Sequence, residues 1–267
     1  MIHPRLSINA LCSIRWSFEQ DLDLWRRIGV HHAGLLISKL EGDRKAKGQL
    51  LRGAGIRPTT IVCGGFDLSA PDSWSETRKI LNGALEFAAE YGCESVYFPP
   101  GCGTGSPWDE VVAQLGKAVA PCVRYSQLCG VRLGIEPSLR VNVSFINSLR
   151  DAVDVCRQTG LAVVADFGNC WMEQDLHDVL QRASPHLCLI QITDMATQSA
   201  VKPGSCRVQI GDGDLPLQRL LHAVLDTGYR GYFDLEVLGP DVEAEGYDRA
   251  VTRGVKRASA LLTRMNL

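Results

Sequence analysis

The sequence of 267 residues has no apolar run long enough to cross a membrane. Its longest apolar runs, such as Leu187–Ile192, fall far short of the roughly 20 residues that a spanning helix needs. The N-terminus also lacks a charged segment followed by an apolar one, which argues against a secretory signal peptide. These two absences predict a cytoplasmic protein without a membrane partner.

An excess of charge of one sign is also missing. The chain has 28 Lys and Arg residues against 30 Asp and Glu residues, which gives a formal net charge of −2. Proteins that bind nucleic acids usually carry a basic patch or a basic domain. The charge balance therefore argues against a nucleic-acid partner.

The ten cysteines never fall in a Cys-x-x-Cys spacing, which argues against a structural zinc site. A chain of this length can bury a sufficient core without disulfides, and apolar residues make up 45% of it. We interpret the cysteines as reduced thiols of a cytosolic protein, most of them packed in the core.

No proline-rich linker or shift in composition divides the chain, and strand-like and helix-like segments alternate along it eight times. The predicted strands are Leu6–Cys12, His32–Ile37, Pro58–Cys63, Ser95–Phe98, Val131–Glu136, Leu161–Asp166, Leu187–Thr193 and Gly231–Leu235. The predicted helices are Phe18–Ile28, a charged helix through Leu50-Leu51, Ser75–Tyr91, Trp108–Leu128, Ser144–Thr159, Leu176–Ala183, Leu215–Asp226 and Tyr247–Arg264. This pattern predicts an α/β protein, a (β/α)8 TIM barrel in which residues 1–267 form a single domain. A doubly wound open sheet is the alternative, but no Gly-x-Gly-x-x-Gly turn follows the first strand.

Polar residues end four of the late strands, where a barrel of this kind places its active site. Glu136, Asp166 and Glu236 each follow an apolar strand, and Gln191 lies near the end of the seventh. Three carboxylates in one mouth repel each other, and a divalent cation is the simplest remedy. An all-oxygen set favours Mg²⁺ or Mn²⁺ over Zn²⁺. The alternative is that these acids cap helices or form salt bridges.

This strand-end pattern resembles the xylose isomerase-like TIM barrels, the sugar phosphate isomerase/epimerase group. Its members include ketose 3-epimerases, inosose dehydratase and 3-dehydroshikimate dehydratase. Glu136, Asp166, Gln191 and Glu236 match the family's metal ligands in order and spacing, and Ile210–Leu215 matches a later segment of its pattern. The resemblance implies a divalent metal, Mn²⁺ or Mg²⁺, with Co²⁺ as a third option.

Three positions depart from the family pattern. Gly34 stands where the second strand often ends in Glu, and Asn169 stands where a His usually follows the strand-six Asp. Gln191 replaces a frequent His ligand, as in the 3-dehydroshikimate dehydratase branch. No histidine is expected at the mouth, which argues against a His-rich trinuclear zinc site.

The resemblance also implies a reaction that begins with removal of a proton next to a carbonyl and passes through an enediolate. Glu136 and Glu236 would move the proton, and Arg207 would hold a carboxylate, a hydroxyl or the enolate. Lys202 in the same loop is a weaker candidate. The first hypothesis is a metal-dependent isomerase or epimerase of a small polyhydroxylated keto compound. The alternatives are a dehydratase of a keto-polyol, such as 3-dehydroshikimate or an inosose, and a barrel that binds a ligand without turnover.

Aromatic residues occur in several loops at the expected mouth, namely Trp16, Phe66, Trp108 and Trp171. They fit either the wall of a substrate pocket or the contacts between subunits of a homo-oligomer.

Overall fold

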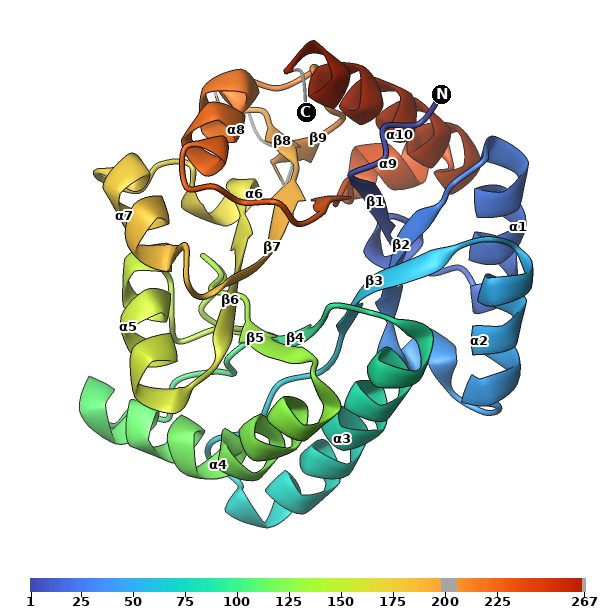
Figure 1. Ribbon diagram of the computed structural model, residues 1–267. Helices are drawn as coiled ribbons and strands as arrows, with labels where there is room; N and C mark the ends of the chain where they lie inside the picture. The colour runs from blue at the N-terminus through green and yellow to red at the C-terminus, as the bar shows by residue number, and fades with distance from the viewer. Residues whose placement is uncertain (198–205, 266–267) are drawn as a thin grey trace.

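A closed barrel of eight parallel strands, ringed by helices, forms the body of the protein (Figure 1). The computed structural model describes residues 1–197 and 206–265. The barrel strands are β1 (Leu6–Asn9), β2 (His32–Leu36), β3 (Arg57–Val62), β4 (Ser95–Phe98), β5 (Arg132–Ile135), β6 (Ala162–Asp166), β7 (Leu187–Ile192) and β10 (Phe233–Leu235). Each barrel strand pairs with the barrel strands that come before and after it in the chain, and β10 closes the ring on β1. The predicted (β/α)8 architecture is confirmed.

The helices lie outside the barrel and cover its strands (Figure 1). They are α1 (Phe18–Ile28), α2 (Arg44–Gly53), α3 (Trp74–Tyr91), α4 (Trp108–Cys129), α5 (Leu149–Thr159), α6 (Phe167–Cys170), α7 (Leu176–Ala183), α8 (Leu217–Leu225), α9 (Pro240–Glu245) and α10 (Tyr247–Arg264). Short 3₁₀ helices span Ala10–Ser13 (η1), Ile37–Leu40 (η2) and Pro71–Ser73 (η3), and β8 (Asp194–Met195) pairs with β9 (Arg207–Val208). Within the described ranges, none of the helices combines the length and the apolar composition that a membrane crossing requires.

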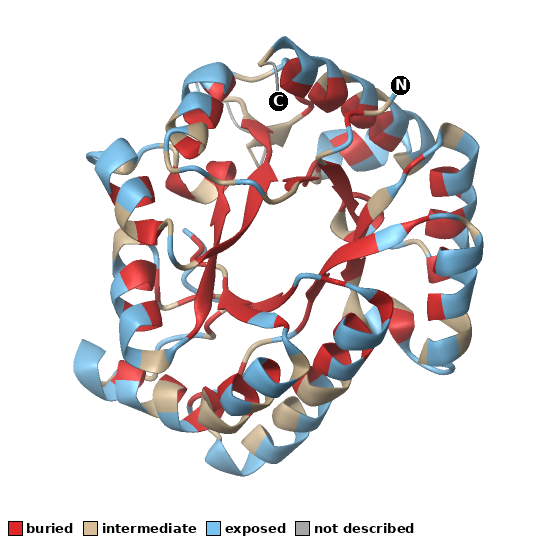
Figure 2. Cartoon of the chain, in the orientation of Figure 1, coloured by how far each residue is buried: buried red, intermediate tan, exposed pale blue. Residues whose placement is uncertain are grey.

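The core lies between the barrel and the helices, and Figure 2 shows buried strands facing the buried sides of the surrounding helices.

Helix α1 illustrates how individual residues fix the two ends of a helix. Ser17 caps the first turn by accepting from the backbone N–H of Gln20, whose side chain accepts from the N–H of Ser17 in return. Gly29 ends the helix with φ 75°, a conformation that glycine adopts without strain. The predicted range Phe18–Ile28 is therefore confirmed.

The two largest departures from the predicted boundaries arise because polar side chains bond locally. The helix expected from Ser144 begins at Leu149, since Ser148 accepts from the N–H of Asp151 and caps it. Ser144 instead bonds to the backbone of Ile146 in the preceding loop. The first strand ends at Asn9 rather than Cys12, because the Asn9 side chain caps η1.

Each of the ten cysteines is a free thiol, and most are buried.

Phe66 is also buried, and its ring packs against those of Phe98 and Trp74 at 5.8 and 6.5 Å between centroids. The expectation that Phe66 lines a pocket or a subunit contact is therefore wrong, since it belongs to the core.

Asp194 organises the loop that follows β9. Its carboxylate accepts from the backbone N–H groups of Met195 at 2.9 Å, Gly211 at 2.8 Å, Gly213 at 3.3 Å and Leu215 at 3.2 Å. A Cβ on Gly213 would lie 2.2 Å from Asp194 Oδ1, so this close approach needs glycine. Asp194 therefore holds the segment that matched the family pattern.

Asp194→Ala is expected to lower the free energy of unfolding by about 3 kcal/mol, because four backbone N–H groups lose their acceptor. Asp194→Asn keeps one acceptor oxygen and should lose less. Urea unfolding of both variants measures the difference. Wild-type stability in Asp194→Ala would contradict the assigned role.

Candidate active site

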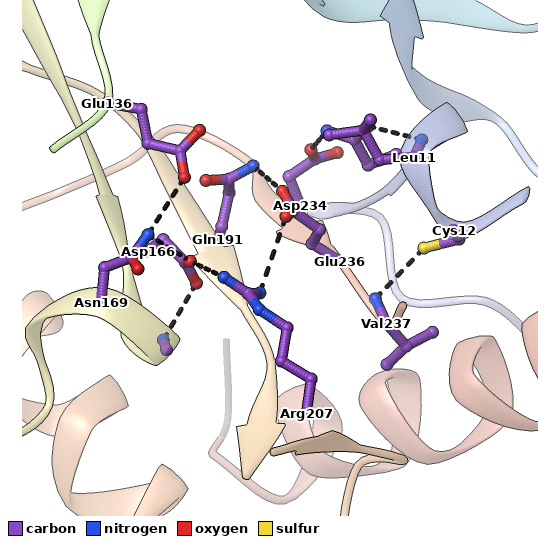
Figure 3. A network of polar contacts seen from close by, with 12 residues as sticks. Leu11, Cys12, Glu136, Asp166, Asn169, Gln191, Arg207, Asp234, Glu236 and Val237 are labelled. Atoms are coloured by element: carbon purple, nitrogen blue, oxygen red, sulfur yellow. Dashed lines mark hydrogen bonds and ion pairs between the residues drawn. The ribbon is translucent and has the colours of Figure 1, made fainter. Parts of the chain in front are cut away.

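The strand register brings the predicted site residues to one end of the barrel. Asp166 of β6 pairs with Gln191 of β7, and Gln191 pairs with Asp234 of β10. Glu236 follows two residues after Asp234, and Glu136 follows directly after β5. Figure 3 shows the side chains of Glu136, Asp166, Gln191 and Glu236 in one cluster, with Arg207 reaching into it from β9.

Asp166 lies at the centre of this cluster and is almost fully buried. Its Oδ1 accepts from the N–H of Gly168 at 3.0 Å, and its Oδ2 accepts from Asn169 Nδ2 at 2.8 Å and from the Arg207 guanidinium. Gly168 leaves the space that Arg207 occupies, since a Cβ there would lie 3.2 Å from the Arg207 Cζ and Nη2 atoms. The first turn of α6 thus fixes the Asp166 carboxylate and leaves room for the Arg207 guanidinium beside it.

The two glutamates join the cluster through different partners. Glu136 Oε1 accepts from Asn169 Nδ2 at 3.2 Å. Glu236 accepts from Gln191 Nε2, and its Oε1 lies 3.6 Å from Arg207 Nη1 (Figure 3). Asn169 therefore bridges Glu136 and Asp166, while Arg207 bridges Asp166 and Glu236.

Both glutamates hold a proton more tightly than an exposed glutamate. Burial, followed by the nearby Glu236 and Asp166 carboxylates, raises the pKa of Glu136 well above its usual range. Burial also raises the pKa of Glu236 to about 7, although Arg207 acts in the opposite direction. A carboxyl group with a pKa of about 7, such as that of Glu236, can give up and take back a proton near neutral pH, as acid–base catalysis requires.

A second group of polar side chains lies inside the barrel, beneath the cluster. Asn9 Nδ2 donates to Asp234 Oδ2 at 2.6 Å and to Tyr97 Oη at 3.4 Å. Gln191 Nε2 donates to the same Tyr97 oxygen at 3.0 Å, which links this group to the cluster. A Cβ on Gly34 would meet both Asp234 carboxylate oxygens at 3.0 Å. The glycine that replaces the family's strand-two Glu therefore makes room for Asp234.

The predicted ligands fit a divalent cation by their chemistry. Gln191 Oε1 is buried and has no hydrogen-bond partner among the described residues, so it is free to accept a ligand. The three carboxylates and this amide oxygen form a hard donor set. Within residues 1–197 and 206–265, however, no three His, Cys, Asp or Glu side chains are grouped as a metal site. Asn169 and Arg207 lie between the carboxylates, so a cation would have to share Asp166 and Glu236 with the guanidinium.

The sequence predicted which residues meet here but did not predict the hydrogen bonds that link them to one another and to the residues beneath. Asn9, Tyr97 and Asp234 were not predicted, although Asp234 stands two residues before Glu236 and alternation along a strand could have placed both on one face. Lys202, the weaker substrate candidate, lies outside the described residues. The roles of the predicted ligands and of Arg207 stay predictions.

Solved structures share this fold over nearly the whole chain. The IolI protein with a bound zinc atom has a TM-score of 0.84 at 16% identity, and the alignment covers 98% of this chain and 99% of that one. D-psicose 3-epimerase from Clostridium cellulolyticum H10, determined with D-tagatose, has a TM-score of 0.74 at 16% identity and 98% coverage of both chains. The probable 3-DHS dehydratase AsbF from Bacillus anthracis has a TM-score of 0.74 at 13% identity, covering 96% of this chain and 98% of that one. At these identities the likeness shows the fold alone.

No curated protein matches the sequence. A family model described as "Xylose isomerase-like TIM barrel" matches residues 23–258, which is most of the chain. The sequence match, the closed barrel and the order of the strand-end residues agree. The chain belongs to the xylose isomerase-like TIM barrel family.

Proposed function

We propose that this protein is a divalent-metal-dependent isomerase or epimerase that acts on a small polyhydroxylated keto compound through an enediolate. The observation that carries the proposal is the pair Glu136 and Glu236. They follow different barrel strands, meet in one cluster, and both have a raised pKa. An epimerase and a zinc-bound protein among the structural neighbours support the same activity and a metal.

The two glutamates divide the proton transfer between them. One carboxylate removes the proton from the carbon next to the carbonyl, and the other carboxyl group returns a proton to the enediolate. Arg207 can donate to the oxygen on which negative charge develops, because its guanidinium already lies among the carboxylates.

A bound Mn²⁺ or Mg²⁺, with Co²⁺ as a third option, would be held by Glu136, Asp166, Gln191 and Glu236 and would act as a Lewis acid on the substrate carbonyl. The protein residues orient the substrate and move the proton. The proposed partner is this small molecule, with neither nucleic acid nor membrane as a partner. We also propose a cytoplasmic location, which the free thiols support.

A dehydratase of a keto-polyol is the second candidate. Gln191 in place of a histidine favours it, as in the 3-dehydroshikimate dehydratase branch, and a probable 3-DHS dehydratase shares the fold. Its first step is the same proton removal. The reactions diverge when the enediolate either takes back a proton or expels a β-hydroxyl, for which a protonated glutamate is a suitable acid.

Hydrogen exchange in D₂O tests the shared first step. Mn²⁺-treated protein is incubated with D-psicose, D-tagatose, an inosose and 3-dehydroshikimate, and the proton next to each carbonyl is followed by NMR. We expect exchange with at least one compound and a loss of at least about 100-fold in Glu136→Gln and Glu236→Gln. A new epimer identifies an epimerase, whereas a product that absorbs in the near ultraviolet identifies a dehydratase. No exchange across the panel would favour a barrel that binds without turnover.

A further inference from the structure

The side-chain amide of Gln191 has one orientation that its surroundings satisfy. Its Nε2 donates to Tyr97 Oη at 3.0 Å and to the Glu236 carboxylate. Its Oε1 is buried and has no hydrogen-bond partner among the described residues. Reversing the amide would place Oε1 against the carboxylate and leave Nε2 without an acceptor. Gln191 Oε1 therefore remains available to bind a ligand in the site.

The Tyr97 hydroxyl is placed beside the Gln191 amide by a chain of contacts that begins at the backbone. The N–H of Leu11 donates to Asn9 Oδ1 at 2.9 Å, so the Asn9 Nδ2 must point the other way. There it donates to Asp234 Oδ2 at 2.6 Å and to Tyr97 Oη at 3.4 Å. A backbone N–H can only donate and a carboxylate accepts, so the Asn9 amide is fixed at both ends. Asn9 and Tyr97 are both buried.

We propose that Asn9 and Tyr97 are positioning residues that set the orientation of the Gln191 amide and so present Oε1 as a metal ligand. This inference rests on the metal site of the proposed function and names the residues that prepare one of its ligands. Partners of metal ligands typically change metal affinity about 10–100-fold when they are removed. An amide needs such control more than a carboxylate does, because only one of its two terminal atoms can bind a cation.

Mn²⁺ binding, measured by electron paramagnetic resonance, tests the role of Tyr97 without any substrate. We expect Tyr97→Phe to bind Mn²⁺ roughly 10-fold more weakly than the wild type, with its thermal midpoint recorded alongside. Tyr229→Phe is the control, since that hydroxyl is also bonded within the protein, donating to the carbonyl of Tyr232 at 2.7 Å, away from the cluster. Its Mn²⁺ affinity should be unchanged. Asn9→Ser, which keeps the Tyr97 hydroxyl, should weaken binding in the same direction.

A double-variant comparison separates positioning from a general loss of packing. In a Gln191→Ala background, Tyr97→Phe should cause no further loss of Mn²⁺ affinity, because there is no amide left to orient. An equal loss with and without Gln191, or unchanged affinity in Tyr97→Phe, would overturn the positioning role and leave the proposed function standing. Failure of the wild type to bind Mn²⁺ would overturn both.

Discussion

Asp166→Asn and Glu236→Gln are each expected to abolish stoichiometric metal binding. Wild-type protein treated with Mn²⁺ should carry about one ion per chain, and each variant should bind at least about 100-fold more weakly, because each loses a charged ligand. Asp166→Asn also weakens the contact with Arg207, which Asp166 now neutralises. The metal content, measured by inductively coupled plasma mass spectrometry, reports the loss directly.

The control for this experiment is a carboxylate away from the cluster. Glu94 is exposed and pairs with Arg57 at 3.4 Å on the surface, so Glu94→Gln should retain the ion. Because Mg²⁺ can be lost during purification, all proteins are measured again after Mn²⁺ is added. Retention of the ion in both cluster variants would place the metal elsewhere. If the wild type takes up none, the carboxylates are structural or act as an acid–base pair without a metal.

The sequence predicts helix bounds well where neighbouring residues cap or end the helix. The helix Tyr247–Arg264 has the bounds expected from its apolar spacing, and Ser17 and Gly29 mark both ends of α1. Ser144 and Ser148 are both suitable caps, and only the loop geometry decides that Ser148 caps α5. Local signals therefore place helices, whereas the choice between equivalent caps depends on contacts made after folding.

The candidate site was partly predictable for a related reason. Glu136, Asp166 and Glu236 are conspicuous because acids follow apolar strands. The position of Arg207 among them depends on the β8–β9 pairing and on the missing Cβ of Gly168, and neither shows in the spacing of the residues. The roles of Asn9 and Tyr97 likewise depend on which way two amides point.

Lys39→Met is expected to lower the free energy of unfolding by about 3–5 kcal/mol near pH 8, because it leaves a buried carboxylate without its counterion. Lys39 Nζ donates to Asp21 Oδ2 at 2.7 Å and to the carbonyls of Ala10 and Ser13 at 2.9 and 2.8 Å. The two charged side chains are 7% and 1% exposed. This pair joins the segments that follow β1 and β2 to helix α1.

The pH dependence identifies the carboxylate responsible. Burial raises the pKa of Asp21 from 3.8 to about 6, against the effect of Lys39. The folded protein thus binds this proton more tightly than the unfolded chain does. Its contribution to stability is present below pH 4 and is lost as the pH rises to about 6, a difference of about 3 kcal/mol. Without Lys39 the pKa rises further, so the cost of Lys39→Met should shrink as the pH falls.

Urea unfolding between pH 4 and 8 measures these differences, with Lys79→Met as the control. Lys79 forms a pair with Glu76 in which both side chains are well exposed, so its loss should change little. The double variant Asp21→Asn with Lys39→Met should recover part of the loss, because no uncompensated charge remains buried. A cost that is the same at every pH and is not recovered would assign the effect to the two carbonyl contacts of Lys39. The segments after β1 and β2 would then be joined by hydrogen bonds rather than by charge.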